Sequence, residues 1–141
     1  MKAWAAIMSV FALIITIGGC QLDSRQQVLL VDKSQVALRS LQSRVFDTSD
    51  RALTLRTIIA TLQDLGFTVD KVDQEIGIVS ATKAGDYLMK MTISTRQRGY
   101  DQTAVRASIQ HNLKAISDAA PYQQFFNSLE QAMFLETNKV H

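Results

Sequence analysis

Cysteine, proline and histidine are scarce in this chain, which has one cysteine, one proline and two histidines in 141 residues. A single cysteine excludes a disulfide within the chain and zinc sites of the Cys₂His₂ type. His111 and His141 leave little from which to build the nucleophile–base pairs of hydrolases. The charge is nearly balanced, with 15 basic and 13 acidic residues, which argues against a nucleic-acid binder. We therefore expect no enzyme, no metal site and no nucleic-acid partner.

Two chemical alternatives remain in the sequence. Ser94 or Ser108 could pair with His111, although a surface serine beside a loop histidine is the commoner arrangement. The acidic residues between positions 70 and 75 suggest calcium. They lack the Asp-x-Asp-x-Asp-Gly order of an EF-hand loop, and an acidic hairpin tip explains them better.

The lone cysteine ends an apolar stretch at the N-terminus. Lys2 is followed by residues 3–17 without a charge, which is the pattern of a secretory signal peptide. This stretch is shorter than the ~20 residues that a bilayer span needs. A branched aliphatic residue, two glycines and the cysteine then follow, and this sequence, Ile17-Gly18-Gly19-Cys20, resembles the lipobox of bacterial lipoproteins.

The resemblance implies that residues 1–19 are a signal peptide, cut between Gly19 and Cys20. It also implies that the Cys20 thiol carries diacylglycerol and that the new amine carries an acyl chain such as palmitate. Two or more acyl chains hold a protein stably to a membrane. In enteric bacteria an Asp after the acylated Cys retains a lipoprotein in the inner membrane, so Gln21 favours the Gram-negative outer membrane, with the domain on its periplasmic face. An uncleaved signal anchor and a buried structural cysteine are the alternatives.

Residues 20–34 are predicted to form a tether, and residues 35–141 a single α+β periplasmic domain. A flexible chain of the tether's length reaches only ~20 Å, so the domain should stay close to its membrane. An apolar run interrupts the polar tether: Val28, Leu29, Leu30 and Val31. This run either folds against the domain as a strand or patch, or docks on a partner protein.

The domain is predicted to open with a long strand. Side chains over residues 35–47 alternate, with apolar residues on both faces. A helix over residues 36–41 is the alternative, and strand is preferred from Gln42 onward because residues 44–46 run directly into a helix start.

That helix start lies in Asp47-Thr48-Ser49-Asp50, where Asp47 or Thr48 is expected to cap the backbone N–H groups and Asp50 to favour the helix dipole. Arg51 is assigned to the solvated face. Apolar residues at spacings of three and four predict one buried stripe, formed by Leu55, Ile58, Ile59, Leu62 and Leu65.

The helix is expected to end at Gly66, which suits a left-handed backbone, with Phe67 folded back on the last turn. Four strands follow in the pattern: 67–72, 76–82 with Gly77 inside, 87–96, and a last strand through Val105, Ala107 and Ile109.

A closing helix opens near Asp118 and Pro121. Its expected inward stripe is Tyr122, Phe125, Phe126, Leu129, Met133 and Phe134. The predicted fold is therefore α+β, with an antiparallel sheet of about five strands packed against two helices in the order β-α-β-β-β-β-α.

This order, the helix ending in Leu65-Gly66-Phe67-Thr68-Val69, and the turn and return over residues 73–79 together resemble the helix-grip domains of the C lipoprotein of the bacterial β-barrel assembly machine. The match covers about residues 42–135 as one domain, whereas that lipoprotein carries two domains after a long extended segment. The resemblance implies a helix-grip-like architecture and an envelope setting, and it does not name a partner.

Two functions fit these observations. In the first, the chain is an accessory or scaffolding subunit that docks on a cell-envelope machine of the outer-membrane assembly, secretion or efflux type. In the second, a groove between the closing helix and the sheet holds a lipid or small apolar ligand. The candidate groove residues are apolar side chains of the third predicted strand and the closing helix: Tyr87, Met89, Met91, Phe125 and Phe126. Such residues more often form plain core.

Overall fold

A computed structural model describes residues 34–138 of the chain. The predicted signal peptide, Cys20 and the apolar run from Val28 to Val31 lie outside these residues. The sheet and its helices belong to one compact unit, which begins at Leu38.

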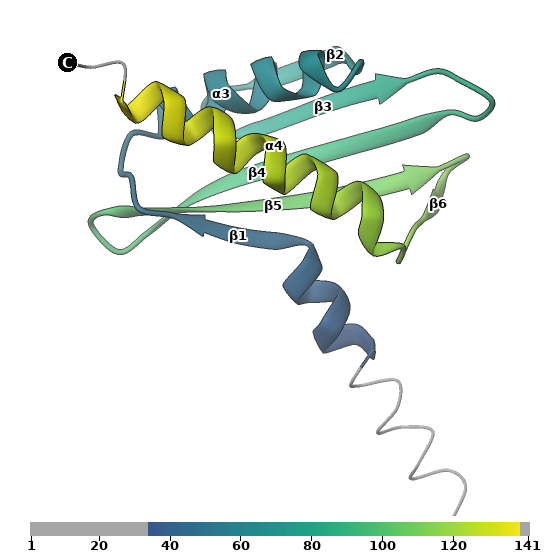
Figure 1. The fold of residues 1–141 in the computed structure, drawn as a ribbon, viewed down its shortest axis with the longest axis horizontal. Helices are drawn as coiled ribbons and strands as arrows, with labels where there is room; N and C mark the ends of the chain where they lie inside the picture. Colours follow the sequence, from purple (N-terminus) through teal and green to yellow (C-terminus); the bar gives the residue numbers. More distant parts are fainter. Residues whose placement is uncertain (1–33, 139–141) are drawn as a thin grey trace, which may run out of the picture. The chain divides into compact units, whose positions relative to one another are not determined.

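Six strands and two helices follow the helical residues 34–41 (Figure 1). In chain order they are β1 (Ser43–Phe46), α3 (Arg51–Asp64), β2 (Thr68–Asp73), β3 (Ile78–Lys83), β4 (Met89–Arg98), β5 (Gln102–His111), β6 (Lys114–Ala115) and α4 (Ala119–Asn138). The strands form one antiparallel sheet in the order β1-β5-β4-β3-β2, and β6 pairs with the edge of β5 that β1 also uses. The predicted α+β fold is confirmed, with the two-residue β6 as an addition.

The expected long first strand is wrong in its first half. Residues 34–41 are helical, and only Ser43–Phe46 join the sheet. Leu38 and Leu41 are three residues apart, so a helix turns both toward one side, and both pack half-buried against the core. A strand would place them on opposite faces. The helical alternative is therefore correct here, because only one side of this segment meets the core.

Helix α3 begins later than expected. The Asp50 side chain is the N-cap and accepts a hydrogen bond from the backbone N–H of Leu53 at 2.8 Å. Thr48 instead accepts from the backbone N–H of Asp50, within the loop before the helix. Phe46 is still paired with Thr103 in the sheet, so the chain needs residues 47–49 to cross from the sheet to the helix layer.

The C-terminal end of α3 matches the prediction. Gly66 has a φ of +81°, which is the left-handed conformation that glycine adopts without strain. The N–H of Phe67 donates to the carbonyl of Leu62, and the N–H of Gly66 donates to that of Gln63, both at 2.9 Å. These two bonds define a Schellman cap, which turns the buried Phe67 back toward the helix.

Gly77 lies before β3 rather than inside a strand. It ends the β2–β3 turn with a φ of +72°. Arg51, expected in solvent, reaches this turn, and its Nη2 donates to the carbonyls of Gln74 (3.0 Å) and Glu75 (2.6 Å). The start of α3 is thereby tied to a turn that is distant in sequence, a contact that local periodicity does not encode.

Helices α3 and α4 cover one face of the sheet and contact each other, as Figure 1 shows. We call this side the covered face. Its buried strand residues are apolar apart from two threonines: Val79, Ala81, Met91, Ile93, Thr95, Thr103, Val105, Ala107 and Ile109. From α3 the core receives Leu55, Ile58 and Leu62, and from α4 it receives Tyr122, Phe125, Phe126, Leu129 and Met133. Residues between these positions along the strands form the opposite, open face.

The inward stripe of α4 is confirmed except at Phe134. Met133 is 5% exposed, whereas Phe134 is 68% exposed. Successive residues are rotated by about 100° around a helix. Phe125 and Phe126 lie on either side of the centre of the stripe and are both buried, whereas Phe134 lies about 100° beyond it. At the other end of α4, the Asp118 side chain accepts from the backbone N–H of Ala120, as expected for a helix start.

Tyr122 fills the gap between β1 and β6 along the edge of β5. Its hydroxyl accepts from the backbone N–H of Ile109 and from Gln42 Nε2, each at 3.3 Å, and donates to the carbonyl of Ile116 at 3.1 Å. The ring is 1% exposed. One buried hydroxyl therefore satisfies backbone groups that no strand pairs.

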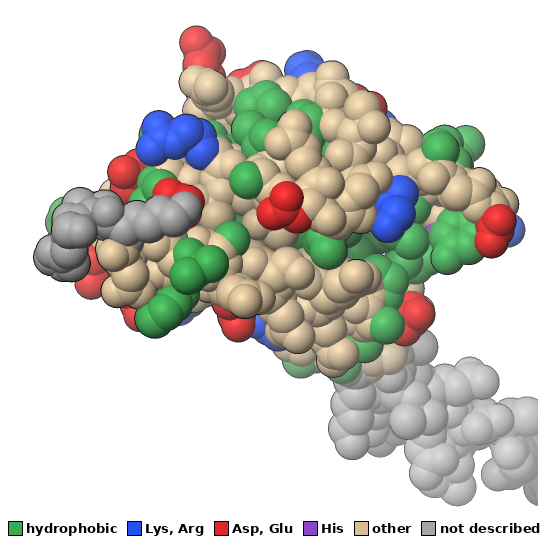
Figure 2. All heavy atoms as spheres, turned by 45° about the horizontal axis from the view of Figure 1, so that its top comes forward, with side chains coloured by type: hydrophobic (Ala, Val, Ile, Leu, Met, Phe, Trp, Pro, Cys, Tyr) green, Lys and Arg blue, Asp and Glu red, His purple; other side chains and the backbone are tan. Residues whose placement is uncertain are grey.

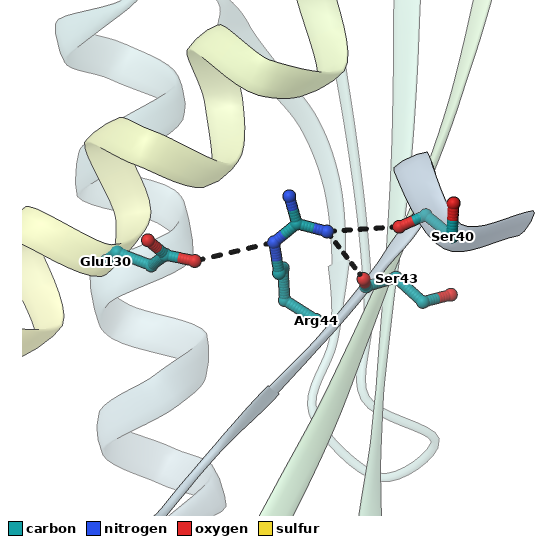
Figure 3. Close-up of polar contacts among 4 residues, drawn as sticks. All are labelled: Ser40, Ser43, Arg44 and Glu130. Atoms are coloured by element: carbon teal, nitrogen blue, oxygen red, sulfur yellow. Dashed lines mark hydrogen bonds and ion pairs between the residues drawn. The ribbon is translucent and has the colours of Figure 1, made fainter. Parts of the chain in front are cut away.

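Arg44 joins the N-terminal part of the unit to α4 (Figure 3). Its Nε lies 3.5 Å from Glu130 Oε1, and its Nη1 donates to the carbonyls of Ser40 (3.0 Å) and Ser43 (3.2 Å). The guanidinium carbon is also 5.3 Å from the centre of the Phe126 ring. Arg44 thus holds the chain between the first helical residues and β1 against the last helix.

Candidate functional site

Exposed apolar side chains gather at the end of the sheet where β4 begins and β5 ends. Tyr87 and Leu88, from the β3–β4 loop, are 46% and 47% exposed, and Leu113, from the β5–β6 turn, is 83% exposed. We call these three residues the apolar rim. Figure 2 shows hydrophobic side chains grouped at this end of the molecule, on the right of the view.

Hydrogen bonds hold the loop and the turn of the apolar rim together. The N–H of Asn112 donates to the carbonyl of Leu88 at 2.9 Å, and the N–H of Leu88 donates to Asn112 Oδ1 at 3.2 Å. The Tyr87 ring also lies against the His111 ring, with 3.8 Å between centroids. The rim is therefore a fixed surface feature rather than a set of independent side chains.

The backbone at Leu113 is strained. Asn112 and Leu113 form the two-residue β5–β6 turn with φ values of +46° and +69°. Asn-Gly is the preferred pair for such a turn, because both positions need a positive φ. Leucine in this conformation costs about 1–2 kcal/mol relative to glycine. Because Leu113 is 83% exposed, packing in the core does not offset this cost.

A pocket of about 360 Å³ opens beside the apolar rim. It lies between the end of α3, the β3–β4 loop and the start of α4. The lining residues are Leu65, Phe67, Lys83, Ala84, Gly85, Asp86, Tyr87, Met89, Met91, Asp118, Ala120, Pro121 and Gln124. The pocket therefore combines an apolar wall with a few charged groups near its mouth, which is the usual make-up of a small-ligand site.

Lys83 is fixed at this pocket. Its Nζ donates to the carbonyl of Leu65 at 2.8 Å and lies 5.7 Å from the centre of the Phe67 ring. The bond satisfies a carbonyl at the end of α3. Asp86 and Asp118 bring carboxylates to the same lining, so both signs of charge are present.

The structure brings together three of the five candidate groove residues. Tyr87, Met89 and Met91 line the pocket. Phe125 and Phe126 are fully buried in the core and are not among its lining residues. Their rings pack edge to face, with 5.1 Å between centroids. The pocket lies toward the start of α4 instead, one turn before the phenylalanine pair.

The serine–histidine alternative has no geometric support. Ser94 pairs across the sheet with Arg106, and Ser108 pairs with Thr92, so both serines lie on the open face. His111 lies at the end of β5, where its ring contacts Tyr87, and by strand alternation it belongs to the opposite face. Its Nε2 is buried and has no hydrogen-bond partner among the residues that the structure describes.

The acidic residues around the β2–β3 turn serve the turn itself. Asp73 Oδ1 accepts from the backbone N–H of Ile76, and Asp70 accepts from the Thr82 hydroxyl. Within residues 34–138, His, Cys, Asp and Glu side chains form no cluster of three or more that could hold a metal ion. None of the helices over the same residues is long and apolar enough to cross a membrane.

Comparison with known proteins finds no matching family model and no curated protein with a matching sequence. Function therefore has to be inferred from the sequence and from the geometry of the chain.

Sequence reasoning missed Leu113 and Asn112. The predicted last strand ends near Ile109, and the sequence pattern predicts no further element before the closing helix. Asn112 lies between the alternating residues of β5 and Lys114-Ala115, and asparagine is a typical first residue of a tight hairpin turn. This residue is the signal from which β6 could have been predicted. A leucine at the second position hides that signal, because glycine is expected there.

Proposed function

We propose that this chain is a non-enzymatic lipoprotein anchored in the outer membrane of a Gram-negative bacterium and facing the periplasm. It acts as an accessory or scaffolding subunit of a cell-envelope machine, through protein–protein contact. The sequence Ile17-Gly18-Gly19-Cys20 supports the anchor. The apolar rim supports the contact, and the observation that carries it is Leu113, an 83% exposed leucine held at a φ of +69°.

The chemistry of this contact follows from the rim. Tyr87, Leu88 and Leu113 offer apolar surface beside a pocket, so the partner is expected to present an apolar side chain that enters the pocket mouth. The resemblance to the C lipoprotein of the β-barrel assembly machine, with its similar element order, supports an envelope setting for this partner.

The anchor is tested by intact mass and by detergent partitioning. The native protein should begin at Cys20 and carry the added mass of diacylglycerol and one further acyl chain. Cys20→Ser should retain the leader and lack both additions. A native protein of unmodified mass, or one that keeps residues 1–19, would overturn the anchor.

The contact is tested by crosslinking the native protein in its own membranes and comparing two single substitutions. Leu113→Gly removes the exposed side chain and relieves the backbone strain, so it should raise the free energy of unfolding by up to about 1 kcal/mol while it reduces capture of the partner complex. Tyr100→Ser is the matched control, because Tyr100 is 96% exposed at the opposite end of the β4–β5 hairpin. It should leave capture unchanged.

A higher free energy of unfolding together with lower capture of the partner is specific to a rim that contacts the partner, because a variant that merely folds less well would lower both. If Leu113→Gly captures the same complex at the native yield, the rim is not the contact. A further version with Val28, Leu29, Leu30 and Val31 made polar tests the tether as a second contact. Loss of capture in that version alone would move the docking site to the tether.

The pocket favours a second candidate, the binding of a small apolar ligand or a lipid acyl chain. Its volume of about 360 Å³ is within the range of small-molecule sites, and Met89, Met91 and Phe67 supply apolar walls. Methionine walls adapt to irregular apolar ligands.

Native mass spectrometry of the purified full chain tests this second candidate. A stoichiometric bound lipid, lost when Met91 is replaced by Lys but kept in Arg56→Lys, would establish it. Arg56 is an exposed residue of α3 and does not line this pocket. If the protein prepared from its own membranes carries no ligand, the ligand-binding function is excluded and the protein–protein contact is the function that remains.

A further inference from the structure

The open face of the sheet concentrates positive charge that the overall composition does not show. In β3, β4 and β5 the open-face positions alternate with the buried ones and pair across the sheet. They hold Ile78, Ser80, Thr82, Lys90, Thr92, Ser94, Arg96, Arg98, Gln102, Ala104, Arg106, Ser108 and Gln110. Four of these residues are basic, none is acidic and five carry hydroxyls. We call Lys90, Arg96, Arg98 and Arg106 the basic face.

The four cations of the basic face form no ion pair with any residue that the structure describes. Lys90, Arg96 and Arg98 are all exposed, and the one ion pair between described residues joins Arg44 to Glu130 instead. Arg106 makes a long contact of 3.4 Å with the side-chain oxygen of Gln42. The carboxylates nearest in the sheet belong to the edge strand β2. Asp73 accepts from the backbone N–H of Ile76 in the turn, and Asp70 accepts from the hydroxyl of the open-face residue Thr82. Four charges thus share one face without a neutralising partner in residues 34–138.

The shape of the basic face selects the kind of anion. Lys90 and Arg98 are eight residues apart on β4, so at ~3.3 Å per residue the charges extend over ~26 Å. None of the four cations lines the pockets described at the helix layer and at the ends of the sheet. A broad array of cations and hydroxyls spread over this length suits a surface of many anions rather than one small anion. The face also lacks aromatic residues, on which a single-stranded nucleic acid would stack.

We propose that the basic face binds anionic phospholipid headgroups, so that the domain lies with the open side of its sheet against the membrane surface. The inference rests on the proposed anchor only for proximity, because a short tether keeps the domain within ~20 Å of the lipid. The four exposed cations of this face and the Ser108 hydroxyl, which is also exposed, match phosphate oxygens in both charge and hydrogen bonding. With helices α3 and α4 on the far side, the pocket and its rim stay accessible beside the membrane.

The test uses the full chain with Cys20→Ser, which has no acyl anchor, and measures flotation with vesicles. Phosphatidylcholine vesicles are compared with vesicles that contain phosphatidylglycerol. The unprocessed leader carries the N-terminal amine and Lys2, so it adds its own attraction to phosphatidylglycerol. This contribution is the same in every variant, so the change in the ratio of the two partition coefficients between variants reports the contact of the basic face. This ratio should exceed one clearly and should fall toward one in about 0.5 M salt, where screening is strong.

Two triple substitutions with the same change in net charge locate the contact. Lys90, Arg96 and Arg98 to Gln should lower the phosphatidylglycerol ratio about 100-fold, since each basic residue at an anionic membrane contributes about fivefold. Arg39, Arg56 and Lys114 to Gln remove three exposed charges that are not on the basic face, and should change the ratio less than about threefold. Circular dichroism checks that both variants are folded.

Equal losses in both triple variants would overturn the proposal, because net charge alone would then explain the binding. Retention by immobilised polyglutamate without any preference for phosphatidylglycerol would overturn it in favour of an acidic protein partner. Failure of the anchor is a separate outcome, since it is read from the mass of Cys20 in the native protein and not from these vesicles.

Discussion

The two faces of the sheet come from the same strands and have opposite character. On β4 the buried Met91, Ile93 and Thr95 alternate with Thr92, Ser94 and Arg96. The covered face is almost wholly apolar and carries the packing with two helices, whereas the open face carries charge and hydroxyls. Stability is thus concentrated on one side of each strand, and the other side is free to carry binding chemistry.

The largest expected effect comes from one phenylalanine in the covered layer. Phe126→Ala should lower the free energy of unfolding by about 3–5 kcal/mol, because it removes a fully buried ring and leaves a cavity. Phe134→Ala, on the exposed side of the same helix, should change it by less than about 0.5 kcal/mol. Chemical denaturation of the two variants measures the contrast, and equal losses would show that α4 is rotated from its described position.

Gly77 is expected to come next, because it meets two side chains as well as needing a positive φ. A Cβ at Gly77 would collide with Thr95 Oγ1 and come within 2.7 Å of Arg51 Nη2. Gly77→Ala should therefore cost about 2–4 kcal/mol of unfolding free energy, as the sum of backbone strain and the clash. Gly99→Ala has the same need for a positive φ, +66°, with nothing within 4 Å, so it should cost only about 1–2 kcal/mol. Thermal or urea unfolding gives both values. An equal cost for the two variants would show that the close approach of Arg51 to Gly77 adds nothing to the backbone strain.

The buried hydroxyl of Tyr122 gives a smaller effect. Tyr122→Phe keeps the ring but leaves the N–H of Ile109 without its partner, at an expected cost of about 1–3 kcal/mol. Tyr100→Phe, at a 96% exposed position, should leave the unfolding free energy unchanged within about 0.5 kcal/mol. Hydrogen exchange at the Ile109 amide should become faster in Tyr122→Phe alone, and unchanged exchange there would contradict the assigned bond.

The smallest effect is expected at the start of α3. Asp50→Ala removes the N-cap acceptor of the helix and should cost about 1 kcal/mol. Asp47→Ala loses an exposed hydrogen bond from Gln102 and should cost less than about 0.5 kcal/mol. Denaturation midpoints with unchanged slopes measure the two costs. A larger cost for Asp47→Ala than for Asp50→Ala would show that Asp47 is the N-cap.

Local signals located most of the elements. The Schellman end of α3 at Gly66, the stripe of α4 and the alternation of β4 follow from spacing and from single residues that punctuate the chain. The sequence over residues 36–41 is compatible with a strand and with a helix, because its apolar residues fit either period. Only the position of the core decides between them, and Leu38 and Leu41 both turn toward it.

The candidate site was less predictable than the elements around it. Of the five residues predicted to line a groove, Tyr87, Met89 and Met91 line the pocket, whereas Phe125 and Phe126 belong to the core. Leu113 was missed because its backbone conformation contradicts its residue type. The link between Arg51 and the Gln74–Glu75 turn was missed because it joins positions more than twenty residues apart.

By itself the sequence determined the class of fold and the order of its main elements, because each depends on residues that are neighbours along the chain. The lipid anchor at Cys20 stays a proposal from the sequence. The tertiary structure decided which residues share a face. It brought Leu88 beside Leu113 to form the apolar rim, and it aligned Lys90, Arg96 and Arg106 on one side of the sheet. Antiparallel register sets these groupings, and register depends on hydrogen bonds between strands that no single stretch of sequence contains.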